Sequence, residues 1–262
     1  MFARGLVPLS IASVALVVGA FALVFFHAPN DADQGFIQKI FYLHVPLAVV
    51  ALGGFVAGGW FGIRYLRTND RAHDLRSYVA IHLSLILAVG ALVTGSIWAK
   101  GAWGAWWVWE EPTLVSFLIV FLLYACYQPL RFSIEDPERQ ARSASVFAIV
   151  CGAFVPLNFL AVRMAESLIH PRVLSTTGGA MPGEMRITFL VSLLAMAVLF
   201  VTLWKYELTS KQAAMRLRAL RRRLADDDDP WVPVRRSAAP QQLADDDDPW
   251  LPTRRSAAPQ RL

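Results

Sequence analysis

Two histidines that are closely followed by proline are the side chains best suited to bind a cofactor in this sequence. His44 stands in the motif F-Y-L-H-V-P, and His170 stands in S-L-I-H-P. A neutral imidazole nitrogen is a common ligand of haem iron, so the pair could supply two axial ligands to one iron. A single histidine near a membrane surface is more often a hydrogen-bonding residue than a ligand. Only their joint placement favours a ligand pair.

A second unusual feature is the segment W-A-K-G-A-W-G-A-W-W-V-W-E-E-P at residues 98–112, which holds five of the nine tryptophans. If it is helical, Trp103, Trp106 and Trp107 share one face through their i, i+3 and i+4 spacing. Gly104 would let a ligand approach the backbone closely. Such a flat aromatic surface suits a large planar apolar ligand. The alternative interpretation is an aromatic belt at a membrane interface.

Two acidic residues close this segment. Glu110 and Glu111 directly precede Pro112, a residue that fits the first turn of a helix. Their negative charges would stabilise a helix start, or one of them would take a direct part in ligand binding. The sequence alone leaves both roles open.

The other histidines and the cysteines are weaker candidates. His73 and His82 fall on or near the predicted cytoplasmic side, and only His27 could compete for a site on the outer side. Cys126 and Cys151 lie within apolar segments and form neither C-x-x-C nor C-x-x-C-H. Thiol redox chemistry and covalent haem attachment to this chain therefore have no motif to support them.

Long apolar segments must position these residues. Of the 262 residues, 56% are hydrophobic and 17% are charged, whereas soluble domains carry about 25% charged residues. The windows without Asp, Glu, Lys or Arg are 6–26, 40–63, 77–99, 112–130, 143–162 and 187–204. Each approaches the ~20 residues that cross a bilayer as a helix.

This pattern predicts an all-α integral membrane protein with six transmembrane helices. It also predicts a short interfacial tryptophan-rich segment between the third and fourth helices. A soluble enzyme and a nucleic-acid-binding protein of the usual kind are excluded. So is a β-barrel, whose strands alternate over ~10 residues.

Lysine and arginine predict the orientation of the helices. Leaving aside the five in the tail beyond residue 223, fifteen of them fall on the side of the N-terminus, the second and fourth loops and the stretch 205–223, against five on the other side. By the positive-inside rule both termini are cytoplasmic. The five outer residues are Lys39, Lys100, Arg163, Arg172 and Arg186. The last four would be available to pair with haem propionates, for which arginine has the better geometry.

The C-terminal part differs from the rest in composition. Residues 211–223 predict a basic cytoplasmic extension of the last helix, next to the anionic leaflet or solvated. Residues 224–241 recur as 243–260, with acidic runs, prolines and few large apolar residues. We therefore expect a six-helix membrane domain over 1–210 and a disordered tandem-repeat tail over 224–262.

The residues W-G-A-W-W-V-W-E, with F-Y-L-H-V-P upstream and L-I-H-P downstream, resemble the CcmC family. This family, haem exporter protein C of bacterial cytochrome c maturation, belongs to the tryptophan-rich haem-handling proteins. The resemblance spans about residues 1–210. It implies that His44 and His170 are axial ligands of a non-covalently bound haem iron. The other residues that it implies for haem binding are Trp103, Gly104, Trp106, Trp107, Trp109 and Glu110.

The resemblance also implies partners and a location. Haem would be delivered to the membrane-anchored chaperone CcmE, in a complex with the ABC-type ATPase pair CcmA and CcmB and the small protein CcmD. The chain would lie in the bacterial inner membrane with its haem on the periplasmic side, contacting lipid but no nucleic acid, and would not be an enzyme. No G-x-x-x-x-G-K-[ST] loop occurs in the sequence, consistent with ATP hydrolysis elsewhere.

Two departures from the family pattern stand out. Glu110 replaces the usual Asp, and Glu111 and Pro112 occupy positions where a basic residue commonly follows. Lys100 or Arg172 would then have to replace that cation. The alternative functions are a haem or solute transporter, which would need polar or broken helices at the midplane, and a haem b subunit of a membrane oxidoreductase, which would favour histidines on facing helices.

Overall fold

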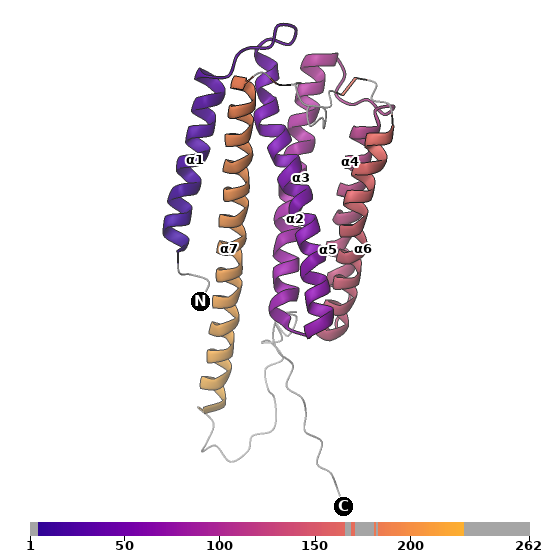
Figure 1. The fold of residues 1–262 in the computed structure, drawn as a ribbon. Coiled ribbons are helices and arrows are strands. Elements are labelled where there is room, and N and C mark those ends of the chain that lie inside the picture. The colour runs from indigo at the N-terminus through magenta and orange to yellow at the C-terminus, as the bar shows by residue number, and fades with distance from the viewer. Residues whose placement is uncertain (1–4, 166–168, 171–180, 182, 228–262) are drawn as a thin grey trace, which may run out of the picture.

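The computed structural model describes residues 5–165, 169–170, 181 and 183–227, and the regular elements in these ranges are helices (Figure 1). In chain order they are α1 (Leu6–Phe26), the 3-10 helix η1 (Phe36–Ile40), α2 (Phe41–Thr68), α3 (Arg71–Trp103), α4 (Pro112–Ala125), α5 (Tyr127–Phe132), α6 (Pro137–Met164) and α7 (Gly183–Asp227).

Six helical stretches in the described residues are long and apolar enough to span a membrane. They are α1, η1 with α2, α3, α4 with α5, α6 and α7. The predicted all-α membrane protein with six spanning helices is confirmed, and the chain is a multi-pass membrane protein. The start of α1 and the end of α7 lie toward the same end of the bundle (Figure 1).

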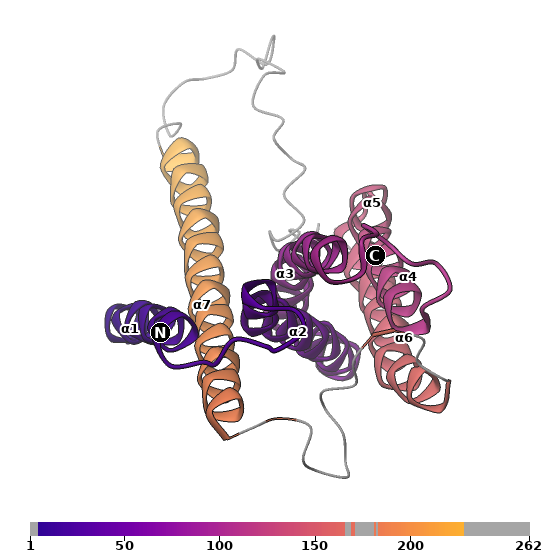
Figure 2. The same ribbon diagram turned by 90° about the horizontal axis from the view of Figure 1, so that it is seen from above.

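Helix α2 lies at the centre of the bundle. It packs on α3, α6 and α7, while α1 packs on α7 at the periphery (Figure 2). Phe55 of α2 stacks on Tyr124 of α4 with ring centroids 3.8 Å apart, and the Tyr124 hydroxyl donates to the Phe55 carbonyl at 3.2 Å. Both side chains are fully buried, so this stack fixes α4 against the centre of the bundle.

A tight turn sets the register between α2 and α3. Asn69 ends α2 in the left-handed conformation, with φ at 51°, and the Asp70 carboxylate caps the start of α3 by accepting from the Ala72 amide at 2.9 Å. Both helices rise ~1.5 Å per residue from this turn. Residues equally distant from the turn therefore face one another, which places position 44 of α2 opposite position 95 of α3.

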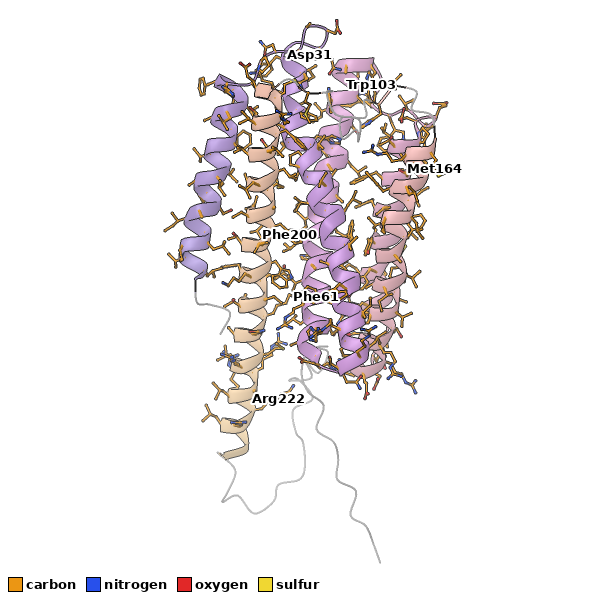
Figure 3. All side chains as sticks on the ribbon, viewed as in Figure 1. Asp31, Phe61, Trp103, Met164, Phe200 and Arg222 are labelled. Atoms are coloured by element: carbon orange, nitrogen blue, oxygen red, sulfur yellow. The ribbon has the colours of Figure 1, made fainter. Side chains whose placement is uncertain are left out.

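Helix α7 continues through residues 211–223 without a break. Figure 3 labels Trp103 near one end of the bundle, here called the tryptophan end, and Arg222 on the part of α7 that extends beyond the opposite end. The division of the chain at residue 210 remains a prediction. The repeat tail lies outside the described residues from position 228 onward.

Candidate functional site

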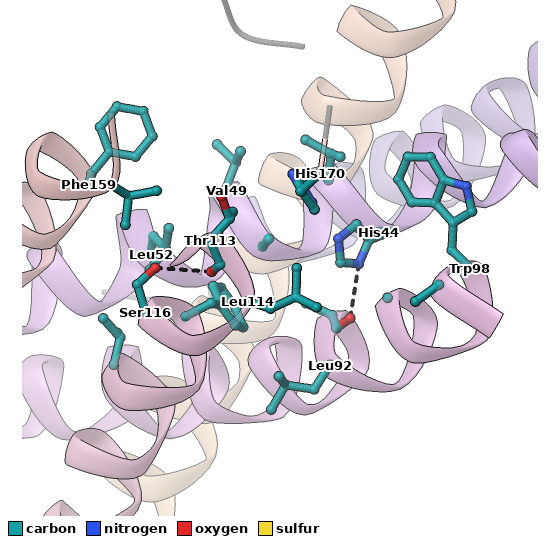
Figure 4. Close-up of a pocket in the computed structure, with 18 of the residues that line it drawn as sticks. His44, Val49, Leu52, Leu92, Trp98, Thr113, Leu114, Ser116, Phe159 and His170 are labelled. Atoms are coloured by element: carbon teal, nitrogen blue, oxygen red, sulfur yellow. Dashed lines mark hydrogen bonds between the residues drawn. The ribbon is translucent and has the colours of Figure 1, made fainter. Parts of the chain in front are cut away.

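A cavity of about 230 Å³ lies among α2, α3, α4 and α6 at the tryptophan end (Figure 4). Most of its wall is formed by Ala, Val, Leu and Phe side chains. The other lining residues that carry hydrogen-bonding or charged groups include His44, Trp98, Thr113, Asn158, Arg163 and His170. An apolar cavity with a few polar groups is typical of a site for a small molecule or cofactor.

The His44 ring is held in one orientation from α3. Its Nδ1 lies 2.9 Å from the Ala91 carbonyl oxygen and 3.3 Å from Thr94 Oγ1, while the Thr94 hydroxyl donates to the Gly90 carbonyl at 2.7 Å. A carbonyl oxygen can only accept, so Nδ1 carries the proton of the neutral ring. The lone pair then lies on Nε2, where it is available to a metal, and hydrogen bonding of this kind orients histidine ligands in metal sites.

Trp98 supports the His44 ring from the side. The two ring centroids are 5.9 Å apart in an edge-on arrangement. Trp98 is buried, and its Nε1 donates to Gln34 Oε1 at 2.7 Å. Trp98 therefore links the chain that follows α1 to the His44 side of the cavity.

His170 borders the same cavity from the segment that follows α6. Its ring makes an edge contact with Trp103, with centroids 6.1 Å apart. The backbone N–H groups of Ile169 and His170 donate to Glu111 Oε2 at 3.0 and 3.2 Å. The structure thus brings the two predicted histidines to one cavity, although they are far apart in sequence.

Glu111 has no exposed surface, and it is the N-cap of α4, accepting from the Thr113 amide at 3.4 Å. Burial raises the pKa of its carboxyl, but the backbone hydrogen bonds from Ile169, His170 and Thr113 outweigh burial and hold that pKa below its ordinary value. The predicted helix-start role is confirmed for Glu111. Glu110 is exposed.

The tryptophan segment is only partly helical. Helix α3 ends at Trp103, Gly104 follows in the left-handed conformation with φ at 78°, and the next helix begins at Pro112. The condition for Trp103, Trp106 and Trp107 to share a helical face is not met, because the helix ends at Trp103 and glycine favours this helix-ending conformation. The three nevertheless line the cavity together.

The structure separates the remaining predicted residues. Gly104, Trp109 and Glu110 lie outside the cavity lining. Trp106 is 60% exposed and Trp109 is 68% exposed. The rings of Trp107 and Trp109 meet edge to face, with centroids 5.9 Å apart. Trp109 therefore contacts a residue that lines the cavity without lining it itself.

The predicted counter-charges also lie in different places. Arg163 borders the cavity, with its guanidinium 4.9 Å from the Phe159 ring centroid. Lys100 Nζ instead donates to the Gly104 carbonyl at 2.8 Å. Arg186 is exposed on the first turns of α7, and Arg172 lies outside the described residues.

Several contacts in this site have no sequence motif. Gly95 leaves room for the His44 ring, Thr94 lies beside its Nδ1, and Gln34 holds the neighbouring Trp98. Glu111 was recognised as a charge near a helix start, but its bonds to residues 169–170 depend on how α4 and the end of α6 meet. Among these residues, only Glu111 could be singled out from its local sequence, as one of two acidic residues before Pro112.

Six membrane-spanning helices, four of which surround an apolar cavity bordered by two histidines and several tryptophans, define a polytopic membrane protein. Within this class the chain belongs to the CcmC family, described as Heme exporter protein C, whose profile matches residues 1–224.

Named relatives agree with this assignment. Heme exporter protein C of Bradyrhizobium diazoefficiens is 34% identical over 200 residues, which cover 75% of this chain and 72% of the relative. The protein of the same name from Rhodobacter capsulatus is 31% identical over 201 residues, 76% of this chain and 83% of the relative. The one from Escherichia coli K12 is 29% identical over 160 residues, which cover 61% of this chain and 65% of the relative.

Proposed function

We propose that this protein binds haem in the cavity at the tryptophan end and presents it to a CcmE-type chaperone. Membership of the CcmC family supports a role in haem handling during cytochrome c maturation. The observation that carries the finer proposal is that His44 and His170 border one apolar cavity together with Trp103, Trp106 and Trp107. Haem is the cargo, and the residues of this chain hold and orient it.

The chemistry of the cavity fits haem. His44 offers its Nε2 lone pair, because Nδ1 is bonded to Ala91, and His170 offers a second imidazole. The buried Nε1–H of Trp107 has no hydrogen-bond partner among the described residues, so a ligand oxygen could accept from it. Arg163 supplies a positive charge for a propionate. The apolar wall excludes water from the porphyrin faces.

Exposed tryptophans favour transfer to a partner over permanent retention. Trp106 and Trp109 are well exposed at the rim of the site, and large exposed apolar side chains mark interaction surfaces. A porphyrin edge on this side would remain accessible to a chaperone. We place this rim on the periplasmic side of the bacterial inner membrane, and CcmA, CcmB and CcmD as partners in one complex.

Transfer of haem tests this function. The full-length protein, purified with haem, should show a six-coordinate low-spin absorption spectrum. Mixing it with a purified CcmE-type chaperone should then move the haem to the chaperone in a form that resists denaturation. Failure to take up haem would contradict the binding proposal. Haem that binds but never reaches the chaperone would contradict delivery.

Gly95→Ala is expected to weaken haem binding about tenfold or more while the fold is kept. A Cβ at residue 95 would lie 2.7 Å from Cε1 and 3.1 Å from Nδ1 of His44. The ring must move away from the Ala91 carbonyl, and overpacking of this kind costs ~1–3 kcal/mol. The helix itself gains, since Ala is favoured over Gly by about 1 kcal/mol in a helix interior. Haem titration followed by absorption measures the change.

Gly90→Ala is the matched control on the same helix. Its Cβ would meet only Leu47 side-chain carbons, at 3.4 and 3.7 Å, so haem affinity should stay unchanged. Equal losses in both variants would mean that the effect comes from α3 in general. An unchanged affinity in Gly95→Ala would show that the observed position of His44 is not needed for binding.

A further inference from the structure

We infer that Glu111 is a positioning residue for His170. Its carboxylate ties the backbone at residues 169–170 to the start of α4 and thereby sets the place of the His170 imidazole at the cavity. This inference rests on the proposed function, because it takes His170 as an iron ligand.

The contacts of Glu111 join two separate segments that border the cavity. Oε2 accepts from the amides of Ile169 and His170 at 3.0 and 3.2 Å. Oε1 accepts from the Thr113 amide at 3.4 Å in the first turn of α4. Hydrogen bonds to an ionised carboxylate are about twice as strong as neutral ones. One buried side chain therefore connects α4 with the segment that follows α6.

The need to satisfy a buried charge makes this connection specific. Glu111 has no exposed surface, and a buried carboxylate without hydrogen bonds is strongly disfavoured. The start of α4 supplies the Thr113 amide to one oxygen, and the amides of Ile169 and His170 donate to the other. Moving the 169–170 backbone away would leave that oxygen without these donors.

Fixing this backbone restricts the His170 ring. With its N–H held by Glu111 and Pro171 next in sequence, His170 has few backbone conformations left, because a residue before proline is sterically restricted. Trp103 then contacts the ring edge-on, with centroids 6.1 Å apart. The side-chain torsions then decide where the imidazole lies.

The length of the side chain separates this role from simple helix capping. Asp, Asn and Ser are the favoured N-cap residues, because a short side chain reaches the first amides best. Glu111→Asp should therefore keep the cap of α4 and the negative charge, but withdraw the carboxylate from Ile169 and His170. Glu111→Gln keeps the length and removes the charge. Glu184→Gln changes an exposed carboxylate in the first turn of α7 and is the matched control.

Two readouts on the full-length protein test the inference. In the haem-free protein, hydrogen exchange in the peptide that contains Ile169 and His170 should accelerate about tenfold in Glu111→Asp and Glu111→Gln. In the haem-loaded protein, both variants should shift the absorption spectrum from six-coordinate low-spin toward five-coordinate high-spin haem. Glu184→Gln should change neither readout.

The outcomes separate the inference from the proposed function. If His170→Ala alters the haem spectrum while both Glu111 variants leave spectrum and exchange unchanged, the positioning role is wrong and the ligand role stands. If exchange accelerates in the Glu111 variants but His170→Ala leaves the haem spectrum unchanged, His170 is not a ligand. Glu111 then positions no iron ligand, and the inference is wrong.

Discussion

Replacing His44 by alanine is expected to remove stable haem binding from the purified protein. His44 projects from α2, and its ring is fixed by the Ala91 carbonyl and by the edge of Trp98. It is thus the better oriented of the two imidazoles. Loss of an outer-shell partner of a metal ligand typically costs about 10–100-fold in affinity, and loss of the ligand itself should cost more. Haem titration monitored by absorption measures this loss.

His170→Ala should have a smaller effect on affinity and a clear effect on the spectrum. The His44 ligand and the tryptophan wall remain, so haem should bind more weakly and as a five-coordinate species. Free imidazole added to this variant should enter the vacated position and restore the six-coordinate spectrum. The wild-type protein should not respond to the same addition.

His82→Ala is the control for both histidine variants. His82 also lies on a membrane-spanning helix, but its ring stacks on Tyr78 with centroids 6.0 Å apart, and Gln128 lies 3.5 Å from its Nδ1. It does not line the cavity. If His82→Ala lost haem while His44→Ala and His170→Ala kept it, the ligand assignment would be wrong.

The six spanning helices could be predicted from the sequence because the bilayer leaves few alternatives. A charged residue in the hydrocarbon region is costly, so charge-free windows of about twenty residues mark the spans. The windows underestimate the helices, since helix α3 runs from Arg71 to Trp103 whereas its window covers only 77–99. Lys100 and the arginines at the other end lie on helix turns beyond the most apolar part, where charge is tolerated.

Residue type and spacing could indicate the candidate site, but not its internal contacts. His44, His170 and the tryptophans stand out as residue types, and five of the predicted haem-binding residues line one cavity. The packing of Gly95 against His44 follows from the register of α2 and α3, and the bonds of Glu111 follow from the meeting of α4 with the end of α6. A single sequence holds no signal for such long-range contacts.

Asp74→Ala is expected to lower the free energy of unfolding by ~3–5 kcal/mol, because it leaves a buried cation without its partner. Arg131 Nη1 and Nη2 donate to Asp74 Oδ1 and Oδ2 at 2.9 and 2.7 Å. Both side chains are almost completely buried, and this pair ties α5 to α3. Thermal or denaturant unfolding of the purified protein in detergent micelles measures the loss.

A second variant and a control define what this loss means. Removing both partners, Asp74→Ala with Arg131→Ala, should cost less than the sum of the single changes, since no unpaired charge remains. Glu207→Ala breaks a partly exposed i, i+4 pair with Lys211 at 3.5 Å and should cost no more than ~1 kcal/mol.

Residue 74 lies ~30 Å from residue 95 along α3, so folded Asp74→Ala protein should bind haem normally. A haem defect in that folded fraction would instead mean that this distant pair also shapes the cavity.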